Sequence, residues 1–267
     1  MNKELFALID KYTDEDIIIA FSGGVDSSLL LKLACESANR KGTKVYAVTF
    51  HTKLHPMKDI EISERVAREM GAIHRIIKVD ELNESGIKNN PVDRCYHCKK
   101  YLFSSLLELA ESMGIRIIID GTNADDLNEY RPGLKALKEL DVKSPLAITG
   151  CTKKEVREMA SEMGISVANR PSAPCLATRF PYDTEISYEI MEKIDKAENY
   201  ISSLGFFNVR VRVHGDIARI EVDTKDISKL IEYKDKIVKY MKESGFMYVC
   251  VDLEGFRSGS MDKKFLT

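Results

Sequence analysis

Short apolar runs alternate with longer helical patterns between residues 16 and 169, and this alternation limits the possible folds more than any other feature of the sequence. Residues 16–21 (DIIIAF) form a β-branched run, and similar runs follow at 44–50, 74–80 and 115–121. Runs of this kind are typical of buried parallel strands. Because a helical pattern separates each run from the next, the sequence predicts an α/β fold, with an open parallel sheet and helices on both faces.

Helix ends are marked by glycines and by a capping box. Gly42, Gly71 and Gly114 each follow a helical pattern and are predicted to end it. Thr152 to Glu155 (TKKE) is a capping box, which predicts that a helix begins there. A last short strand is expected at residues 165–169 (ISVAN).

After about residue 180 the pattern changes to α-β-β-α-β, which predicts a small α+β domain. Residues 169–183 carry three prolines and few periodic positions, so they are interpreted as the joint between two domains. The expected domains are 1–180 and 181–267. In the second domain, helices are predicted at 187–205 and 225–245, and strands at 207–215, 217–223 and 248–253.

Charge is nearly balanced, with 40 Lys and Arg residues against 42 Asp and Glu residues. A net charge near −2 argues against a broad nucleic-acid-binding face. The first residues lack the apolar region and cleavage site of a signal peptide, and no apolar run is long enough to cross a membrane. We therefore expect a cytoplasmic protein without a membrane partner. In the cytosol, a C-x-x-C pair is more often metal-binding or catalytic than a structural disulfide.

The first predicted strand runs into residues 22–28 (SGGVDSS), which we call the phosphate loop, and the next helix begins within it. Gly23 and Gly24 allow the backbone to approach a phosphate closely, and the helix N-terminus offers N–H groups and a positive dipole end. This is neither a Walker A loop nor a G-x-G-x-x-G loop. Two glycines alone would fit an ordinary capped turn, but the full string is much more specific. Further donors, and a carboxylate that could hold a metal ion, come from Ser22, Ser27, Ser28 and Asp26.

A second polar loop, residues 120–126 (DGTNADD), follows the run at 115–121, and we call it the acidic loop. In open parallel sheets ligands bind beyond the carboxyl ends of the strands, where both loops are expected. Asp125 and Asp126 are hard oxygen ligands suited to Mg²⁺, although acidic loops are often only solvated. A tight turn with hydrogen-bond donors is predicted at Gly121, Thr122 and Asn123.

Six cysteines raise the question of a metal or redox site. Cys95 and Cys98 form a C-x-x-C pair, which could be a redox couple, half of a zinc site or part of an iron–sulfur site. The sequence has no second C-x-x-C and no H-x-x-x-H to complete a zinc site. The pair opens a helix with Asp93 as the expected N-cap, so the helix dipole favours thiolates and the spacing places both sulfurs on one side.

Cys175 lies between prolines in the interdomain joint, where Arg170 and Arg179 could stabilise its thiolate. A cysteine in an apolar helix or strand is usually a small buried side chain. On this ground a structural role is predicted for Cys35 and Cys250. Cys151 lies just before the capping box and has no obvious partner, so a structural role is predicted for it as well.

The string S-G-G-V-D-S resembles the signature of the PP-loop ATP pyrophosphatases. The resemblance implies that ATP binds here and is cleaved between its α- and β-phosphates, which adenylates an oxygen of the substrate. It also implies that the loop after the second strand meets adenine through its backbone, at residues 49–52, which include Thr49 and Phe50. The residues implied to hold the pyrophosphate are Ser22, Gly23, Gly24, Asp26, Ser27 and Ser28.

Six stretches spread over most of the chain carry a closer resemblance to one subgroup: FSGGVDSS, RCYHCKKYLF, DGTNADD, RPSAPCLATRFPY, VRVRVHGDIARIE and GFRSGSMDK. With these stretches the chain resembles the LarE family of pyridinium-3,5-biscarboxylic acid mononucleotide sulfurtransferases. This family makes the nickel-pincer nucleotide cofactor of lactate racemase and related enzymes. The resemblance implies a homo-oligomer that acts on a small-molecule nucleotide and needs a sulfide source as partner.

The resemblance also implies how sulfur is delivered. In some members the cysteine matching Cys175 gives up its own sulfur, and in others it joins a C-x-x-C pair in holding a [4Fe-4S] cluster with one open iron. This sequence has Cys95, Cys98 and Cys175, so it resembles the cluster type. ATP and Mg²⁺ would adenylate the substrate carboxylate, and sulfide carried by the cluster would displace AMP to give a thiocarboxylate.

Further candidate residues lie in the C-terminal part of the chain. Arg210 and Arg212 alternate onto one strand face, which suits a substrate phosphate, although charged strand faces are often only solvated. The resemblance implies a catalytic role for Cys175, Glu198, Glu221 and Arg179, and its tail motif includes Arg257 and Ser258.

Three other functions stay open at this point. A tRNA-thiolating PP-loop enzyme would also use three cysteines, but it usually carries zinc-knuckle or RNA-binding modules that this sequence lacks. A nucleotide-binding sensor would bind ATP without turnover. A sacrificial-cysteine enzyme would use Cys175 alone, and its C-x-x-C pair would hold no cluster.

Overall fold

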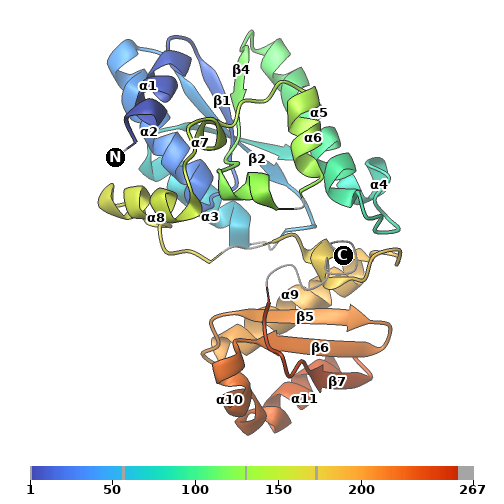
Figure 1. Cartoon of the computed structure of the whole chain (residues 1–267). Coiled ribbons are helices and arrows are strands. Elements are labelled where there is room, and N and C mark those ends of the chain that lie inside the picture. The colour runs from blue at the N-terminus through green and yellow to red at the C-terminus, as the bar shows by residue number, and fades with distance from the viewer. Residues whose placement is uncertain (1, 56–57, 130, 172–173, 258–267) are drawn as a thin grey trace. The chain divides into compact units, whose positions relative to one another are not determined.

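The computed structural model describes residues 2–55, 58–129, 131–171 and 174–257. The chain divides into two compact units (Figure 1). The second unit takes two short segments from the first half of the chain. The first unit comprises Met1–Lys53, Met57–Ile87 and Asp93–Ala173, and the second comprises Leu54–Pro56, Lys88–Val92 and Pro174–Thr267.

A four-stranded parallel sheet forms the centre of the first unit, in the order β3-β2-β1-β4. The register pairs Ile17 with both Val45 and Ile117. These strands coincide with the four β-branched runs of the sequence, which confirms the predicted parallel sheet. They are β1 (Ile17–Ala20), β2 (Val45–His51), β3 (Ile73–Lys78) and β4 (Ile117–Ile119).

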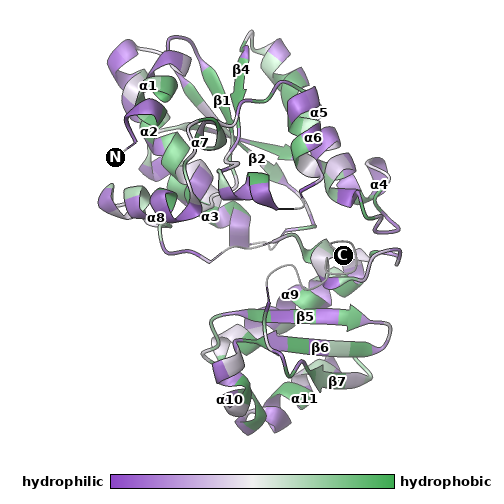
Figure 2. Cartoon of the chain, viewed as in Figure 1, coloured by the Kyte–Doolittle hydropathy of each residue, from purple (hydrophilic) through white to green (hydrophobic). Residues whose placement is uncertain are grey.

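The helices of the first unit are α1 (Lys3–Tyr12), α2 (Val25–Lys41), α3 (Lys58–Glu69), α4 (Glu81–Glu84), α5 (Arg94–Ser112), the 3₁₀ turn η1 (Asp125–Asn128), α6 (Gly133–Glu139), α7 (Pro145–Ile148) and α8 (Lys153–Glu162). Ile17 and Ile19 point into a core cluster with residues of α1, α2, α3 and α8. Ile18 points to the opposite face, into a cluster with residues of α5 and α6. Both faces of the sheet are therefore covered, as predicted, and β1, β2 and β4 are largely hydrophobic (Figure 2).

The predicted helix ends are confirmed in detail. Gly42 ends α2 with a left-handed backbone (φ 75°), a conformation that glycine adopts without a steric penalty. At the start of α8, the Glu155 N–H donates to Thr152 Oγ1 (3.3 Å) and the Thr152 N–H donates to Glu155 Oε2 (2.8 Å). This reciprocal pair is the capping box read from the sequence.

One strand of the first unit was predicted wrongly. Residues 165–169 form a turn rather than a strand, because the Ala168 N–H donates to the Ile165 carbonyl at 3.0 Å. Asp93 is the N-cap of α5, as predicted, although its side chain makes no capping hydrogen bond and its Oδ2 lies 3.0 Å from His97 Nε2. Helix α1 has no predicted counterpart, and the Asn2 side chain caps it.

The second unit has the predicted order α-β-β-α-β. Strands β5 and β6 pair antiparallel, and β6 pairs parallel with β7. Its elements are the 3₁₀ turn η2 (Leu176–Arg179), α9 (Tyr188–Ser203), β5 (Val209–His214), β6 (Ile217–Val222), the 3₁₀ turn η3 (Thr224–Asp226), α10 (Ile227–Glu232), α11 (Lys234–Glu243) and β7 (Tyr248–Val251).

The single helix predicted at 225–245 is wrong, since the structure divides this segment into η3, α10 and α11. The break falls at Tyr233, whose ring lies edge-on to Phe206 at a centroid distance of 6.1 Å. Val209, Val211 and Val213 of β5 are buried, and so are Met191, Ile194, Ala197 and Ile201 of α9. Arg210 and Arg212 therefore lie on the opposite face of β5.

Residues 88–92 join the second unit through hydrogen bonds to its backbone. Asn90 is fully buried, and its side-chain Nδ2 donates to the carbonyls of Phe180 (3.1 Å) and Pro181 (2.6 Å). The Asp183 N–H donates in return to the Asn90 carbonyl at 3.0 Å. No helix within the described residues is long and apolar enough to span a membrane.

Candidate functional site

The phosphate loop follows β1, between the two strands with which β1 pairs. Strand order reverses here, since β2 lies on one side of β1 and β4 on the other. Ligands of open parallel sheets bind at such switch points. Gly23 has φ 68°, and a Cβ atom on it would lie 3.2 Å from the backbone of Ser63. Gly24 is the N-cap of α2 without a side-chain capping bond, which leaves the helix N-terminus suited to an anion.

The serines of the phosphate loop contact one another. Ser22 Oγ lies 3.3 Å from Ser27 Oγ, and Ser27 Oγ donates to the Gly24 carbonyl at 3.2 Å. Ser28 is fully buried, and among the described residues its Oγ has no hydrogen-bond partner. A buried hydroxyl without a partner is costly, so Ser28 is suited to a ligand oxygen.

The acidic loop packs against the phosphate loop. A Cβ atom on Gly121 would lie 3.1 Å from the Ser27 nitrogen and 3.3 Å from Asp26 Cβ, so only glycine permits this approach. Asn123 Nδ2 donates to Asp26 Oδ1 at 3.2 Å. The structure thus brings together the two loops that the sequence placed at the same sheet edge.

The two aspartates of the acidic loop differ in environment. Asp125 is exposed, whereas Asp126 is half-buried and pairs with Arg131 at 2.9 Å. Burial raises the pKa of Asp126, and the nearby Asp26 carboxylate acts in the same direction. Among the residues described, no three His, Cys, Asp or Glu side chains converge as a ready metal site. Any Mg²⁺ here would therefore take further ligands from phosphate and water.

Lys153, the first residue of α8, joins this site and was not predicted from the sequence. Its Nζ contacts Asp26 Oδ2, and its backbone N–H donates to Asp125 Oδ2 at 2.8 Å. The capping box predicts from the sequence that Lys153 lies at the start of a helix. Its contact with Asp26, far earlier in the chain, could not be predicted from the sequence.

Thr49 and Phe50, implied to lie in an adenine-binding loop, are the fifth and sixth residues of β2. Thr49 Oγ1 donates to the Phe21 carbonyl at 2.8 Å, and Phe50 lies 6.1 Å from Phe103 between ring centroids. Thr52, just beyond the strand, donates to the buried carboxylate of Glu81.

Cys95 and Cys98 lie in the first two turns of α5, and we call residues 95–99 the cysteine turn. Cys95 is exposed and Cys98 is half-buried. The buried Arg94 places Nη2 3.9 Å from Cys95 Sγ. Lys99 Nζ lies 3.4 Å from Asp120 Oδ2 at the end of β4. The cysteine turn therefore lies at the carboxyl edge of the sheet, with the two loops.

Cys175 belongs to the second unit, where it precedes η2. Arg179 is 2% exposed and forms two hydrogen bonds with Glu198, at 2.8 and 2.9 Å. Arg179 Nη1 also donates to the backbone carbonyl of Cys175 at 3.3 Å, and Glu198 accepts from the Val211 N–H at 2.8 Å. Arg179 thus holds the segment around Cys175 by its backbone. In the first unit, Arg170 contacts Asp59 and donates to the Gly23 carbonyl.

The arginine face of β5 is largely shielded from water, so it is not simply a solvated strand face. Arg212 is 5% exposed and donates to both carboxylate oxygens of the fully buried Glu221, at 3.1 and 3.0 Å. Arg210 lies over the Phe256 ring at 5.0 Å. Burial, together with the like charge of Arg179, lowers the pKa of Arg210 to about 10.

The predictions for the other three cysteines are partly confirmed and partly wrong. Cys151 is buried, as predicted, and Cys35 is half-buried against the core. Cys250 was expected to be buried but is exposed, because it lies with Tyr248 on the exposed face of β7. Arg257 pairs with Asp252 and Glu254, at 3.6 and 2.7 Å. Ser258 lies outside the described residues.

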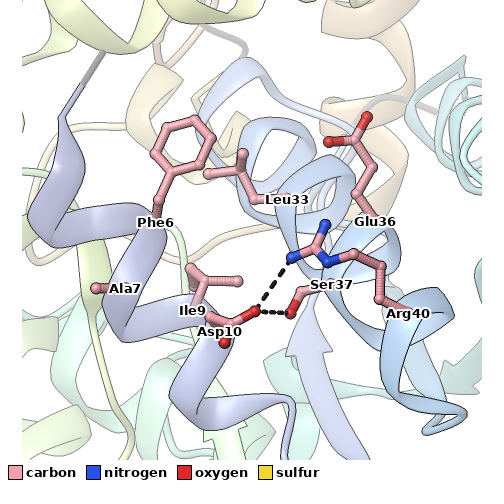
Figure 3. A pocket seen from close by; sticks show the side chains of 8 residues that line it. All are labelled: Phe6, Ala7, Ile9, Asp10, Leu33, Glu36, Ser37 and Arg40. Atoms are coloured by element: carbon pink, nitrogen blue, oxygen red, sulfur yellow. Dashed lines mark hydrogen bonds and ion pairs between the residues drawn. The ribbon is translucent and has the colours of Figure 1, made fainter.

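A separate cavity of about 300 Å³ lies between α1 and α2 (Figure 3). Phe6, Ile9 and Leu33 contribute apolar side chains to its wall. Asp10 Oδ1 accepts from Ser37 Oγ at 2.6 Å and from Arg40 Nη2 at 3.1 Å. Asp10, Ser37 and Arg40 thus bond to one another, and Glu36 pairs with Lys32 at 3.0 Å, so these polar groups already have partners within the protein.

The sequence is similar to that of known nucleotide-binding proteins with a PP-loop domain. The PP-loop domain family covers residues 1–131. The pyridinium-3,5-bisthiocarboxylic acid mononucleotide synthase of Lactiplantibacillus plantarum is 37% identical over 92% of this chain and 88% of its own length. An uncharacterized protein of Methanocaldococcus jannaschii is 37% identical over 94% of both chains.

A more distant similarity joins the chain to tRNA-specific 2-thiouridylases. The enzyme of Rickettsia bellii is 26% identical over 59% of this chain and 52% of its own length. The synthase match is stronger and spans nearly the full length of both proteins. The chain therefore belongs to the LarE family of PP-loop proteins and is an ATP-dependent sulfurtransferase.

Proposed function

We propose that the chain converts carboxylates of pyridinium-3,5-biscarboxylic acid mononucleotide into thiocarboxylates, as a step in nickel-pincer nucleotide synthesis. The observation that carries the proposal is the contact of the acidic loop with the phosphate loop at the switch point of the sheet. Such an edge suits ATP. The similarity over nearly the whole chain to a bisthiocarboxylate synthase supports this choice of substrate.

The pyrophosphate of ATP would bind to the N–H groups at the start of α2 and to Ser28 Oγ. Lys153 would supply the positive charge that a Walker A lysine gives elsewhere. Asp26 and Asp126 would hold Mg²⁺, which in nucleotide sites commonly takes one or two carboxylates together with phosphate oxygens. Lys153 now pairs with Asp26, so binding of the metal by Asp26 would turn the lysine toward the phosphates.

Adenylation makes the substrate carboxylate reactive. A free carboxylate resists nucleophiles, because oxide is a poor leaving group. Attack of one carboxylate oxygen on the α-phosphorus forms a P–O bond, breaks the bond to the β-phosphate oxygen, and yields an acyl-adenylate and pyrophosphate. A sulfur nucleophile then attacks the acyl carbon, and AMP leaves to give the thiocarboxylate.

Arg210 and Arg212 would bind the phosphate of the mononucleotide. Glu221 and the Thr178 carbonyl already orient Arg212. Arg210 is half-buried, and its desolvated charge favours an anionic partner. We therefore assign the main phosphate contact to Arg210 and an orienting role to Arg212.

Cys95, Cys98 and Cys175 would hold the [4Fe-4S] cluster, since three thiolates are suitable donors for it and leave an iron without a protein ligand. When bound, the cluster would supply that iron as a place for sulfide. Arg94 beside Cys95 and the N-terminus of α5 both favour thiolates. Arg179 fixes the backbone around Cys175.

The test is an anaerobic reaction of the purified chain with ATP, Mg²⁺, sulfide and the biscarboxylate mononucleotide. We expect pyrophosphate release that requires the mononucleotide, and a product in which mass spectrometry finds sulfur in place of oxygen. ATP binding without this release would indicate a sensor. Product formation with loss of one sulfur from Cys175 and no iron would indicate the sacrificial route.

A second candidate is tRNA thiolation, favoured by the similarity to tRNA-specific 2-thiouridylases. It predicts a shifted tRNA band and ATP-dependent thiolated nucleosides in digested tRNA. The near-zero balance of charge argues against it.

A further inference from the structure

Asp120 receives hydrogen bonds from three parts of the first unit. It directly follows β4 and is 5% exposed. Its Oδ2 accepts from Thr122 Oγ1 (2.6 Å), and its Oδ1 accepts from the Thr122 N–H (3.3 Å) and from Ser144 Oγ (2.6 Å). These bonds fix the acidic loop and the start of α7. The remaining donor, Lys99, comes from the cysteine turn.

Lys99 is placed by packing as well as by charge. A Cβ atom on Gly133, at the start of α6, would lie 3.0 Å from Lys99 Cδ and 3.3 Å from the Cys95 carbonyl. The lysine stem is thus confined between two helices. Its side chain is 31% exposed, so its charge faces the carboxylate in a partly desolvated setting, where an ion pair is stronger than at a fully exposed surface.

We propose that Lys99 is a positioning residue that holds the cysteine turn in place relative to the acidic loop, through Asp120. This role rests on the proposed function, since it assumes that ATP binds beside the acidic loop. Asp120 keeps three other hydrogen bonds without Lys99, so removal of the lysine charge leaves the acidic loop folded. What is lost is the connection to Cys95 and Cys98.

The contact between Lys99 and Asp120 can be tested in a chain that holds no iron–sulfur cluster. A nucleotide that orders the acidic loop changes the environment of the cysteine turn, and thiol reactivity reports that environment. The probe is the rate of iodoacetamide alkylation of Cys95 and Cys98, resolved by mass spectrometry. The full chain is freed of iron by a chelator under reducing conditions and compared with and without Mg²⁺ and α,β-methylene-ATP.

In the wild-type chain we expect the nucleotide to change the alkylation rate of at least one of the two thiols by about fivefold or more, the lower range of coupling between linked sites. Lys99→Met keeps the aliphatic stem but removes the charge. In this variant the ratio of the alkylation rates with and without the nucleotide is expected to fall to about one. Lys99→Arg is expected to keep the wild-type ratio.

Lys100→Met is the matched control. Lys100 is the next residue of α5, and it bonds to Tyr96 and Glu139 rather than to the acidic loop. It should behave as wild type. A purely structural role for Lys99 would lower the thermal midpoint but leave the nucleotide response of the thiols intact.

Two results overturn the positioning role alone. One is a Lys99→Met response equal to that of wild type, and the other is no response in a wild-type chain that calorimetry shows to bind the nucleotide. Failure of the wild-type chain to bind the nucleotide at all would overturn the proposed function, and this role with it.

Discussion

Lys153 brings a positive charge to a phosphate loop whose own residues carry none. We expect Lys153→Met to weaken ATP binding and slow pyrophosphate release by about tenfold or more, because a hydrogen bond to a charged group contributes roughly 1.5–3 kcal/mol. Calorimetry and a pyrophosphate assay measure the two effects. Lys154→Met is the control, since Lys154 is 85% exposed and lies 3.9 Å from Glu158. Equal losses in both variants would contradict the role of Lys153.

Cys35 illustrates how burial alone alters a thiol. Desolvation raises the pKa of Cys35 to about 11, so the neutral thiol persists at all pH values below that. Only the thiolate is alkylated. We therefore expect Cys35 at pH 8 to react hundreds of times more slowly than an ordinary thiol, on the basis of ionisation alone, as a roughly 2.5-unit difference in pKa implies.

The measurement is alkylation of Cys35 across pH 7 to 11, followed by mass spectrometry. The rate should rise about tenfold per pH unit, as expected for a thiolate below its pKa. The exposed Cys250 is the internal reference for access. Alkylation of Cys35 at pH 8 as fast as Cys250 would show that the thiol is not buried.

The turn η2 depends on a buried ion pair with α9. Arg179 and Glu198 have side chains that are 2% and 13% exposed. Removal of one partner of a buried pair leaves the other charge uncompensated. We therefore expect Arg179→Ala to lower the free energy of unfolding by about 3–5 kcal/mol.

Urea denaturation followed by circular dichroism measures this loss. Lys196→Met in α9 is the control, because its ion pair with Glu192 lies at the surface, and its denaturation midpoint should not move. An Arg179→Ala midpoint equal to that of wild type would mean that the pair does not hold η2 in place.

The elements that the sequence predicts best are those whose local pattern and burial agree. Ile17, Ile18 and Ile19 are β-branched and buried on both faces of the sheet, so a short apolar run was enough to predict the strand β1. Residues 165–169 show the limit of this argument. Ile165 and Val167 are buried, but they reach the core from a turn, and periodicity over five residues cannot distinguish the two cases.

Part of the candidate site could be predicted from the sequence, and part of it could not. The phosphate loop and the acidic loop follow strands, so their common edge could be deduced from the order of elements alone. Lys153 and Lys99 could not, because each becomes relevant only through a contact with a distant carboxylate, Asp26 or Asp120. The break at Tyr233 likewise depends on a ring contact with Phe206 rather than on helix propensity.

The proposed cluster would take its thiols from Cys95, Cys98 and Cys175. An anaerobic iron and sulfide count on the full chain should therefore give about four of each in wild type, the content of a [4Fe-4S] cluster. Cys95→Ser, Cys98→Ser and Cys175→Ser should each lose most of it. Cys250→Ser should retain it, and full iron in Cys175→Ser would exclude that thiol as a ligand.

The exchange of hydrogen bonds between Asn90 and residues 180–183 has a consequence for how such a chain can be recombined. A single crossover near residue 173 would take Asn90 from one parent and its partners from the other. Asn90 is fully buried, so a mismatch there would leave polar backbone groups unsatisfied. Residues 174–267 can therefore not be exchanged between parents as one continuous segment. A chimera should fold only if residues 88–92, which belong to the second unit, come from the same parent as residues 174–267.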